Sequence, residues 1–482
     1  MITLINTNRM TPPIAPVGLD YISAALRQSK IEVDILDLCL ADDAADVVLR
    51  RYFARHSPEL VGLSFRNVDD CFWPSAQWFV PALAEIVGTI RNLTDAPVVL
   101  GGVGFSVFSE QIVRYTGADF GIRGDGEQPL VSLVQQLRGG RAFEKVDGLL
   151  WRADGEIHSN RPAWPERLSL GSARDAVDNL TYFKKGGQAG IETKRGCNRQ
   201  CIYCADPLAK GPALRLRDPR EVADEAQVLL DRGIDVLHIC DSEFNIPRSH
   251  ALAVCAEFVR RSLPKRLRWY AYMAVRPFDA ELAEAMARAG CVGIDFTADA
   301  ACDRMLQTYR DSHLRRDIAE AVKLCRKNRI TVMLDLLLGG PGETPETAAE
   351  TIEFIKRIGP DCAGASLGVR IYPGTQMARI VEAEAPLDEN PAVRRKYPGP
   401  IDCFKPTFYI SAALGAHPAA LIRRLIAGDE RFFEPMLETD AAAAGNVAST
   451  DHNYNENLRL TAAIADGFRG AYWDILRRLK TQ

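Results

Sequence analysis

Short apolar segments alternate with amphipathic segments along most of this chain, and this alternation limits the folds open to it. In the first 145 residues the apolar runs are rich in β-branched side chains and have the length of strands. The runs cover residues 2–5, 31–36, 60–64, 98–100 and 119–122, and helical spacing separates them, as at 44–56 and 76–91. Strands that alternate with helices predict a doubly wound parallel sheet, which is a Rossmann-like α/β unit.

A second series of the same kind predicts a partial parallel (β/α)6 barrel. Its candidate strands are 189–194, 236–240, 268–271, 292–296, 330–338 and 364–370, and its candidate helices are 219–232, 250–261, 280–289, 315–327 and 345–358. Chemistry in such a barrel belongs at the carboxyl ends of the strands. The predicted domains are therefore 1–145 (Rossmann-like), 146–185 (a linker with a hairpin at Asp154-Gly155), 186–380 (barrel) and 381–482 (mostly helical, alanine-rich over 415–480).

Composition excludes several classes of function. A net charge of −4 gives no electrostatic reason to expect nucleic acid or an anionic membrane as partner. No apolar run reaches the roughly 18 residues of a membrane span, and the amino-terminal apolar run is too short for a signal peptide. Twelve scattered cysteines in 482 residues predict reduced thiols and a cytoplasmic protein.

Three cysteines, Cys197, Cys201 and Cys204, lie on one short segment with three and then two residues between them. Three thiolates on one loop can hold three irons of a four-iron, four-sulfur cluster and leave the fourth iron open to a substrate or cofactor. The alternative is a zinc knuckle, which usually needs a fourth protein ligand nearby. No further cysteine or histidine follows in the next thirty residues, so the cysteine spacing favours the cluster.

The cysteine spacing, with Tyr203 before the last cysteine, resembles the signature of the radical S-adenosylmethionine superfamily. The first domain resembles the cobalamin-binding domain that precedes many of these barrels, through residues 11–19, Gly101-Gly102 and 124–127. The resemblance implies a 4Fe-4S cluster, S-adenosylmethionine and cobalamin as cofactors, a small-molecule substrate, and an external electron donor of the flavodoxin or ferredoxin type. It implies a C-methyltransferase that acts on an unactivated carbon. A non-methylating reaction of the same cofactors, such as cyclisation, rearrangement or aminocarboxypropyl transfer, and a sensor module remain alternatives.

In the first domain, the resemblance places cobalamin at the loops that follow strands. The implied contacts are Pro16, Gly18, Arg66, Asn67, Asp69, Gly101, Gly102, Val103, Gly104, Phe105, Gly124, Asp125, Gly126 and Glu127. The only histidine of the first 150 residues, His56, lacks the sequence context of a lower cobalt ligand and is interpreted as a surface residue at a helix end. Arg66, after the strand 60–64, is the candidate for the lower corrin face. It would leave that face without a ligand, because a guanidinium cannot ligate cobalt. Its alternative role is an ion pair with Asp69 or Asp70.

In the barrel, the resemblance assigns a further set of residues to S-adenosylmethionine. These are Tyr203, Asp241, Glu243, Arg276, Asp295, Arg310, Gly339 and Gly340, with helix capping or surface exposure as the alternative for several of them. Asp335 interrupts an apolar strand, and a buried carboxylate needs a partner or a polar cavity. It is therefore predicted to be a catalytic or substrate contact.

Overall fold

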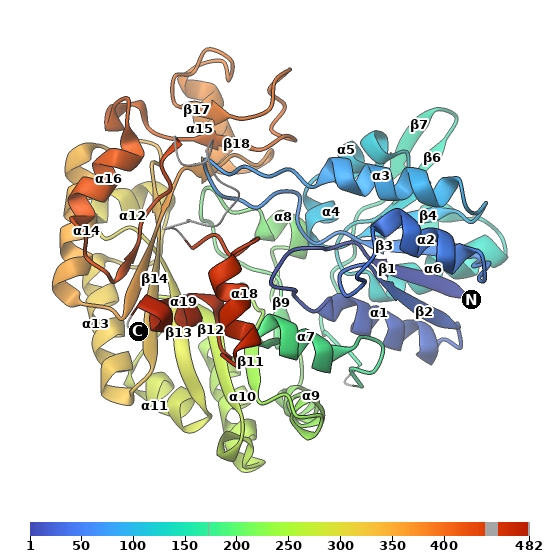
Figure 1. Ribbon diagram of the computed structural model, residues 1–482, viewed down its shortest axis with the longest axis horizontal. Coiled ribbons are helices and arrows are strands. Elements are labelled where there is room, and N and C mark those ends of the chain that lie inside the picture. The colour runs from blue at the N-terminus through green and yellow to red at the C-terminus, as the bar shows by residue number, and fades with distance from the viewer. Residues whose placement is uncertain (172, 439–451, 481–482) are drawn as a thin grey trace.

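The computed structural model describes residues 1–171, 173–438 and 452–480. Two large sheets lie side by side in it, the first at the right of Figure 1 and the second at the left. Helices alternate with the strands of each sheet along the chain and cover it. The predicted α/β fold class, with a Rossmann-like unit before a partial barrel, is confirmed.

The first sheet has seven strands in the order β2-β1-β3-β4-β5-β6-β7. The strands are β1 (Ile2–Asn6), β2 (Val33–Asp37), β3 (Leu60–Ser64), β4 (Val98–Gly101), β5 (Phe120–Ile122), β6 (Leu149–Ala153) and β7 (Glu156–Ser159). The first five run parallel, whereas β6 is antiparallel to both of its neighbours, β5 and β7. The hairpin predicted in the linker is thus present, and it extends the edge of the first sheet.

Helices cover both faces of this sheet, as expected for a doubly wound unit. The helices are α1 (Val17–Gln28), α2 (Ala45–Phe53), α3 (Val80–Arg91), α4 (Val103–Val107), α5 (Ser109–Thr116) and α6 (Glu127–Arg138). Apolar side chains of α2, α3 and α5 form one core with the sheet, and those of α1 and α6 form a second core on its other face. The loops between strands and helices are left at the carboxyl edge of the sheet, facing the barrel.

The second sheet is the barrel, with the parallel order β19-β15-β14-β13-β12-β11-β8. Its strands are β8 (Ala189–Ile191), β11 (Val236–Ile239), β12 (Arg268–Ala274), β13 (Cys291–Asp299), β14 (Thr331–Leu338), β15 (Cys362–Leu367) and β19 (Phe432–Phe433). Its helices are α9 (Pro219–Asp231), α10 (Arg248–Arg260), α11 (Ala280–Arg288), α12 (Asp303–Tyr309), α13 (Arg315–Asn328) and α14 (Pro345–Ile358). Between β8 and α9 lie β9 (Lys194–Arg195), α8 (Asp206–Lys210) and β10 (Arg215–Leu216).

The C-terminal region contains strands as well as the predicted helices. A small antiparallel sheet, β16-β18-β17, forms from β16 (Val369–Arg370), β17 (Val393–Arg395) and β18 (Thr407–Tyr409). The helices are α15 (Gln376–Glu384), α16 (Pro418–Ile426), α18 (Leu458–Ala465) and α19 (Tyr472–Lys480). Side chains of α16, α18 and α19 belong to the barrel core. Of the predicted helical segment 415–480, residues 439–451 lie outside the described residues.

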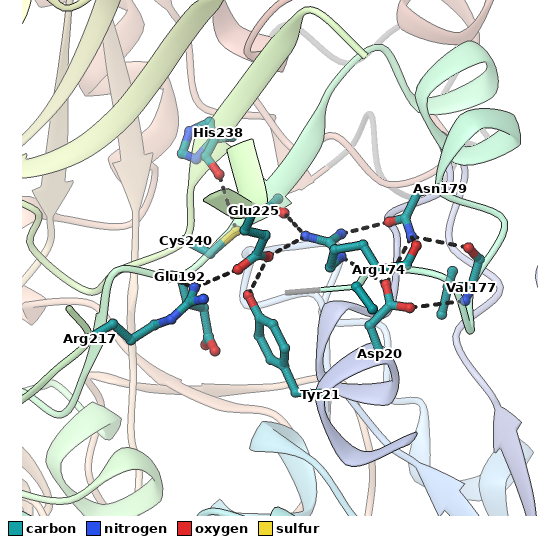
Figure 2. A network of polar contacts seen from close by, with 12 residues as sticks. Asp20, Tyr21, Arg174, Val177, Asn179, Glu192, Arg217, Glu225, His238 and Cys240 are labelled. Carbon is teal, nitrogen blue, oxygen red and sulfur yellow. Dashed lines mark hydrogen bonds and ion pairs between the residues drawn. The ribbon is translucent and has the colours of Figure 1, made fainter. Parts of the chain in front are cut away.

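A buried network of charges joins the first domain to the barrel (Figure 2). Arg174, on the segment before α7 (Asn179–Gly186), pairs with Asp20 of α1 and with Glu225 of α9, at 2.8 Å in each case. Glu225 also accepts a hydrogen bond from the Tyr21 hydroxyl at 2.8 Å and pairs with Arg217 at 2.6 Å. All four charged side chains are at most 1% exposed. The network therefore fixes α1 against the barrel.

Among the described helices, none combines the length and the apolar character that a membrane crossing needs.

Candidate active site

A cavity of about 700 Å³ lies at the carboxyl edge of the first sheet, where that edge faces the barrel. The predicted cobalamin contacts that line it are Pro16, Gly18, Arg66, Asn67, Gly101, Gly102, Val103, Gly124, Asp125, Gly126 and Glu127. They come from the loops after β1, β3, β4 and β5. The topology thus brings four separate sequence segments to one cavity, as is usual at the carboxyl ends of parallel strands.

Two glycines permit the close approach of the loops after β3 and β4. Gly102 has φ +106°, and a Cβ there would lie 2.6 Å from the carbonyl oxygen of Phe65. A Cβ on Gly104 would lie 2.9 Å from the backbone of Arg66. Neither Gly104 nor the fully buried Phe105 lines the cavity, and the Phe105 ring packs over Gly121 instead. In the structure these two residues shape the loop and do not line the cavity.

The cavity continues from the strand ends into an apolar slot between the sheet and helices α1 and α6. Leu4, Ile22, Val99, Ile122 and Leu130 line this slot. A large volume with an apolar extension suits a macrocycle that carries an appended aromatic base, as cobalamin does. The residues present therefore fit cobalamin.

Arg66 lies where the sequence analysis placed it, on the cavity wall, and its guanidinium donates a hydrogen bond to Asn67 at 3.1 Å. The alternative partners are engaged elsewhere. Asp69 is buried and pairs with Arg370 at 2.9 Å, while Asp70 accepts hydrogen bonds from Ser75 and other groups. Asp69 does not line the cavity and instead holds the loop in place.

His56 follows α2, stacks on Tyr52 with ring centroids 4.2 Å apart, and lies away from the cavity.

The segment 124–127 joins the first domain to the barrel through ion pairs at the cavity edge. Arg195 of β9 lies 3.3 Å from Asp125 and 2.9 Å from Glu127. Arg215 of β10 lies 3.0 Å from Asp125 and stacks on Trp164. Burial raises the pKa of Glu127, but the charge and the hydrogen bond of Arg195 lower it, and the net result is a pKa below the ordinary value. These two acids thus position the domains as well as lining the cavity.

The three cysteines lie on the loop after β9. The Cys197 amide donates to the Gly211 carbonyl at 3.1 Å, and the Ile202 amide donates to the Tyr309 carbonyl at 3.2 Å, which fixes both sides of the loop. The thiols are close enough to influence one another: burial, and then the neighbouring charges, raise the pKa of Cys201 and of Cys204. All three are free thiols, and such a donor set fits an iron–sulfur cluster.

Asp241 and Glu243, both predicted to contact S-adenosylmethionine, have different environments. The Asp241 carboxylate is buried and accepts hydrogen bonds from the Thr193 amide at 2.8 Å and the Thr193 hydroxyl at 2.5 Å. It therefore fixes the strand that precedes the cysteines. One Glu243 oxygen accepts from Thr297 at 2.9 Å, and the other is buried without a partner among the described residues. Burial raises the pKa of Glu243 to about 8, so this carboxylate fits a cationic ligand.

Two further carboxylates, Asp299 and Asp311, lie near the cysteine loop, and the sequence analysis missed both. The Tyr203 hydroxyl donates to Asp299 at 2.6 Å. The thiol of Cys201 lies 4.0 Å from Asp311. Burial raises the pKa of Asp299 to about 6 and that of Asp311 to about 10. Asp299 ends strand β13, and that position at a strand end was the signal available in the sequence.

Of the remaining predicted contacts, Asp295 is buried within β13, and the other four divide into two groups. Arg276 and Arg310 point to solvent: Arg276 is 57% exposed and lies 3.8 Å from Asp317, and Arg310 follows α12 as an exposed residue. Gly339 and Gly340 follow β14 inside the protein, where a Cβ on Gly340 would lie 2.1 Å from the Tyr309 hydroxyl. Gly340 is therefore required for packing against Tyr309, whereas Gly339 has φ +94° and packs near Leu367 and Ile410.

Asp335 faces the inside of the barrel, as predicted. Its side chain is 39% exposed although it lies in the middle of β14, and its carboxylate is 3.0 Å from Nε2 of His452. His452 also lies 3.3 Å from the Ser366 hydroxyl, and a Cβ on Gly364 would lie 2.4 Å from the imidazole. The C-terminal region thus inserts a histidine into the barrel, and no sequence motif marked it.

Comparison with known proteins agrees with these two sites. Residues 191–355 match the model of the radical SAM superfamily, and residues 5–134 match that of the B12 binding domain. The chain is 30% identical to tryptophan 2-C-methyltransferase of Streptomyces laurentii, over 98% of this chain and 95% of that protein.

Two solved structures are similar along most of the chain. The methyltransferase TsrM of Kitasatospora setae, bound to tryptophan and a SAM analogue, is 31% identical, with TM-score 0.91 over 100% of this chain and 99% of that one. The cobalamin-dependent radical enzyme OxsB has the same fold at 15% identity, with TM-score 0.69 over 85% of this chain and 64% of that one.

The fold and the cysteine loop define a radical S-adenosylmethionine enzyme with a B12 binding domain. The chain belongs to the cobalamin-dependent radical S-adenosylmethionine methyltransferases. The predicted family, its methyl-transfer activity and its three cofactors are confirmed, and the substrate of this family is a small molecule.

Proposed function

We propose that this enzyme methylates a ring carbon of tryptophan or of a closely related indole amino acid. The observation that carries the proposal is the composition of the cavity. Arg66 and Asn67 of the first domain line one wall, and Tyr272 and Tyr454 of the barrel and the C-terminal region line another. A planar aromatic substrate packs against the rings of Tyr272 and Tyr454, with the corrin between it and Arg66. The similarity to tryptophan-bound TsrM over the full chain supports this substrate.

When bound, the cofactors supply the methyl group and the redox chemistry of its transfer. The protein's part is to hold them and to exclude water. We assign Cys197, Cys201 and Cys204 to the cluster. Tyr203 is assigned to S-adenosylmethionine because it is part of the cysteine loop, and Glu243 because it is near enough to Cys197 and Cys201 to influence their pKa.

The cobalamin contacts in this proposal are the cavity-lining residues of the first domain. Arg66 is assigned to the lower side of the corrin. A guanidinium has no lone pair to offer a metal, so Arg66 occupies that side without ligating cobalt. The loop glycines Gly101 and Gly102 allow the backbone to approach the macrocycle, because neither carries a side chain.

The proposal includes an external one-electron donor of the flavodoxin or ferredoxin type and a reducing, cytoplasmic location. All twelve cysteines are free thiols in the structure. Thiols persist in that state where glutathione and thioredoxin keep them reduced.

The test is product analysis with the anaerobically reconstituted holoenzyme. The enzyme, S-adenosylmethionine and tryptophan are incubated with and without a reductant, and the products are separated by mass spectrometry. We expect a methylated tryptophan together with S-adenosylhomocysteine. Methylthioadenosine without a methylated product, or no product from tryptophan, tryptamine and indole-3-propionate alike, contradicts the proposal. The variant Cys201→Ala is the matched negative control.

A further inference from the structure

A row of side chains with one shared orientation crosses the inner face of the barrel. Tyr272 of β12 lies directly opposite Asp295 of β13, and Thr297 of β13 lies opposite Asp335 of β14. Residues opposite each other on neighbouring strands share a face, and so do residues two apart on one strand. Since Tyr272 lines the cavity, Asp295 and Asp335 also face the inside of the barrel.

Asp295 has an environment that a buried carboxylate rarely has. It is 3% exposed, and its Oδ1 atom is buried without a hydrogen-bond partner among the described residues. Burial of an ionised group without a partner is strongly unfavourable. A polar ligand atom at this oxygen would supply the missing partner.

The groups that face Asp295 are acidic or aromatic. Its pKa is raised well above the ordinary value, first by burial and then by the charges of Asp335 and Glu243. Burial, and after it the nearby charges of Asp295 and Asp335 among others, raises the pKa of Tyr272 and of Tyr454. No arginine or lysine forms an ion pair with Asp295 in the described ranges. Arg66 is near enough to influence the pKa of Tyr272, and His452 lies beside Asp335. Asp295 itself has no cationic partner among the described residues, so a positive charge is its missing complement.

Asp335 adds a second carboxylate with a fixed position. Nε2 of His452 lies 3.0 Å from its Oδ1 atom, and the missing side chain of Gly364 leaves space for the imidazole. His452 is therefore a positioning residue, because it holds one oxygen of Asp335 in place. The Asp335 carboxylate remains 39% exposed to the barrel interior.

These carboxylates lie deep relative to the cysteine loop. Asp299, which accepts the Tyr203 hydrogen bond, is four residues beyond Asp295 on β13. Four residues of strand correspond to about 13 Å. Glu243, which is assigned to S-adenosylmethionine, accepts a hydrogen bond from Thr297, and Thr297 lies between Asp299 and Asp295 on β13. Asp295 is at the level of Tyr272 in the cavity wall.

We propose that Asp295 and Asp335 bind a primary ammonium group, namely the α-ammonium of the amino-acid substrate, and so select amine-bearing aromatic molecules. The inference rests on the proposed function and names the feature that the site recognises. Carboxylates accept charge-assisted hydrogen bonds from an ammonium group, and the neighbouring rings of Tyr272 and Tyr454 favour a cation. An analogue without the ammonium leaves the carboxylates unpaired, which a site of this kind rejects strongly.

The test measures binding to the holoenzyme separately from turnover. Dissociation constants are determined by equilibrium dialysis for tryptophan, tryptamine and indole-3-propionate, which lacks the amine. We expect the wild type to bind the two amines about 100-fold more tightly than indole-3-propionate. The variants Asp295→Asn and Asp335→Asn should reduce this preference, expressed as a ratio of dissociation constants, to about threefold or less. The exposed control Asp303→Asn should keep the ratio of the wild type.

The same experiment separates the two possible sources of the ammonium group. If Asp295→Asn weakens the binding of S-adenosylmethionine alone and leaves the ratio unchanged, the group bound there is that of the cofactor, and the assignment to the substrate is overturned. Equal binding of the three compounds by the wild type overturns it as well, and this measurement needs no variant. If the wild type binds the amines more tightly than indole-3-propionate but does not methylate tryptophan, only the proposed function is contradicted.

Discussion

The carboxylate of Asp69 lies 2.9 Å from Nε of Arg370, a residue 301 positions further along the chain. Both side chains are at most 2% exposed. Asp69 belongs to the loop after β3 that carries Arg66, and Arg370 ends the short strand β16 beyond the barrel. The ion pair therefore holds a cavity-lining loop of the first domain against the C-terminal part of the protein.

Replacement of Arg370 by Gln should destabilise the protein by about 3–5 kcal/mol, because it leaves the Asp69 carboxylate buried without its countercharge. Urea unfolding followed by circular dichroism measures the change. Arg114→Gln is the control, since the Arg114–Glu110 pair is 63% and 59% exposed and such pairs contribute about 1 kcal/mol or less. Equal unfolding midpoints for the two variants would show that the buried pair is not important for stability.

Replacement of Gly102 by Ala should weaken cobalamin binding roughly tenfold and destabilise the first domain by about 1–3 kcal/mol. The physical reason is a Cβ 2.6 Å from the Phe65 carbonyl at a residue with φ +106°. Cobalamin retained after gel filtration and the urea midpoint are the measurements. Gly88 of α3, with no atom within 4 Å of an added Cβ, is the matched control. Gly88→Ala should gain about 0.5–1 kcal/mol, and a similar loss in both variants contradicts the steric argument.

The buried carboxyl group of Glu343 is expected to make the free energy of unfolding depend on pH. It is 1% exposed, and burial raises its pKa to about 7. Because the pKa of Glu343 is higher in the folded state than in the unfolded state, the folded state keeps the proton up to a higher pH. The associated stability is present below about pH 4.5 and is lost as pH rises towards 7, by about 3 kcal/mol in total.

The variant Glu343→Gln has no such proton and should gain stability relative to the wild type as pH rises. Its amide oxygen can still accept from the Gly339 amide, which donates to Glu343 in the structure. Urea unfolding of both proteins at pH 5 and pH 8 gives the difference. The exposed Glu346→Gln, in the first turn of the helix α14 that follows Glu343, should follow the wild type. Parallel pH profiles of wild type and Glu343→Gln would refute the prediction.

Removal of one cluster thiol should separate the two cofactor sites. Cys201→Ala is expected to lose the iron–sulfur absorption and all methyl transfer while it keeps cobalamin, since Cys201 lies on the loop after β9 and the corrin contacts lie in the first domain. Iron, sulfide and cobalt analysis of oxygen-free protein provides the readout. Cys39→Ala, on the loop after β2, should keep both cofactors. Full iron content in Cys201→Ala would invalidate the cluster assignment.

Local sequence was sufficient to predict the two parallel sheets. Apolar periodicity depends on neighbours within a few residues, so β1 to β5 and the barrel strands were found close to their observed limits. Short strands such as β16 and β19 were missed, because their pairing with distant strands, rather than their own composition, creates them.

The candidate site divides in the same way. Spacing alone marked the three cysteines, and strand ends marked Arg66, Asn67 and Glu243, since each of these signals is contained in one segment of sequence. The sequence could not show that Asp241 accepts a hydrogen bond from the Thr193 hydroxyl, or that Arg276 and Arg310 point to solvent.

What the sequence by itself determined was the order of strands and helices and the cofactor loops between them, because hydrogen-bonding pattern and apolar spacing are local properties. What only the tertiary structure decided was which side chains meet. The contacts of Asp335 with His452 and of Asp69 with Arg370 join segments 117 and 301 residues apart. Such contacts depend on the packing of the whole chain. A buried charge needs a partner, and here the partner comes from a distant segment that local sequence patterns do not identify.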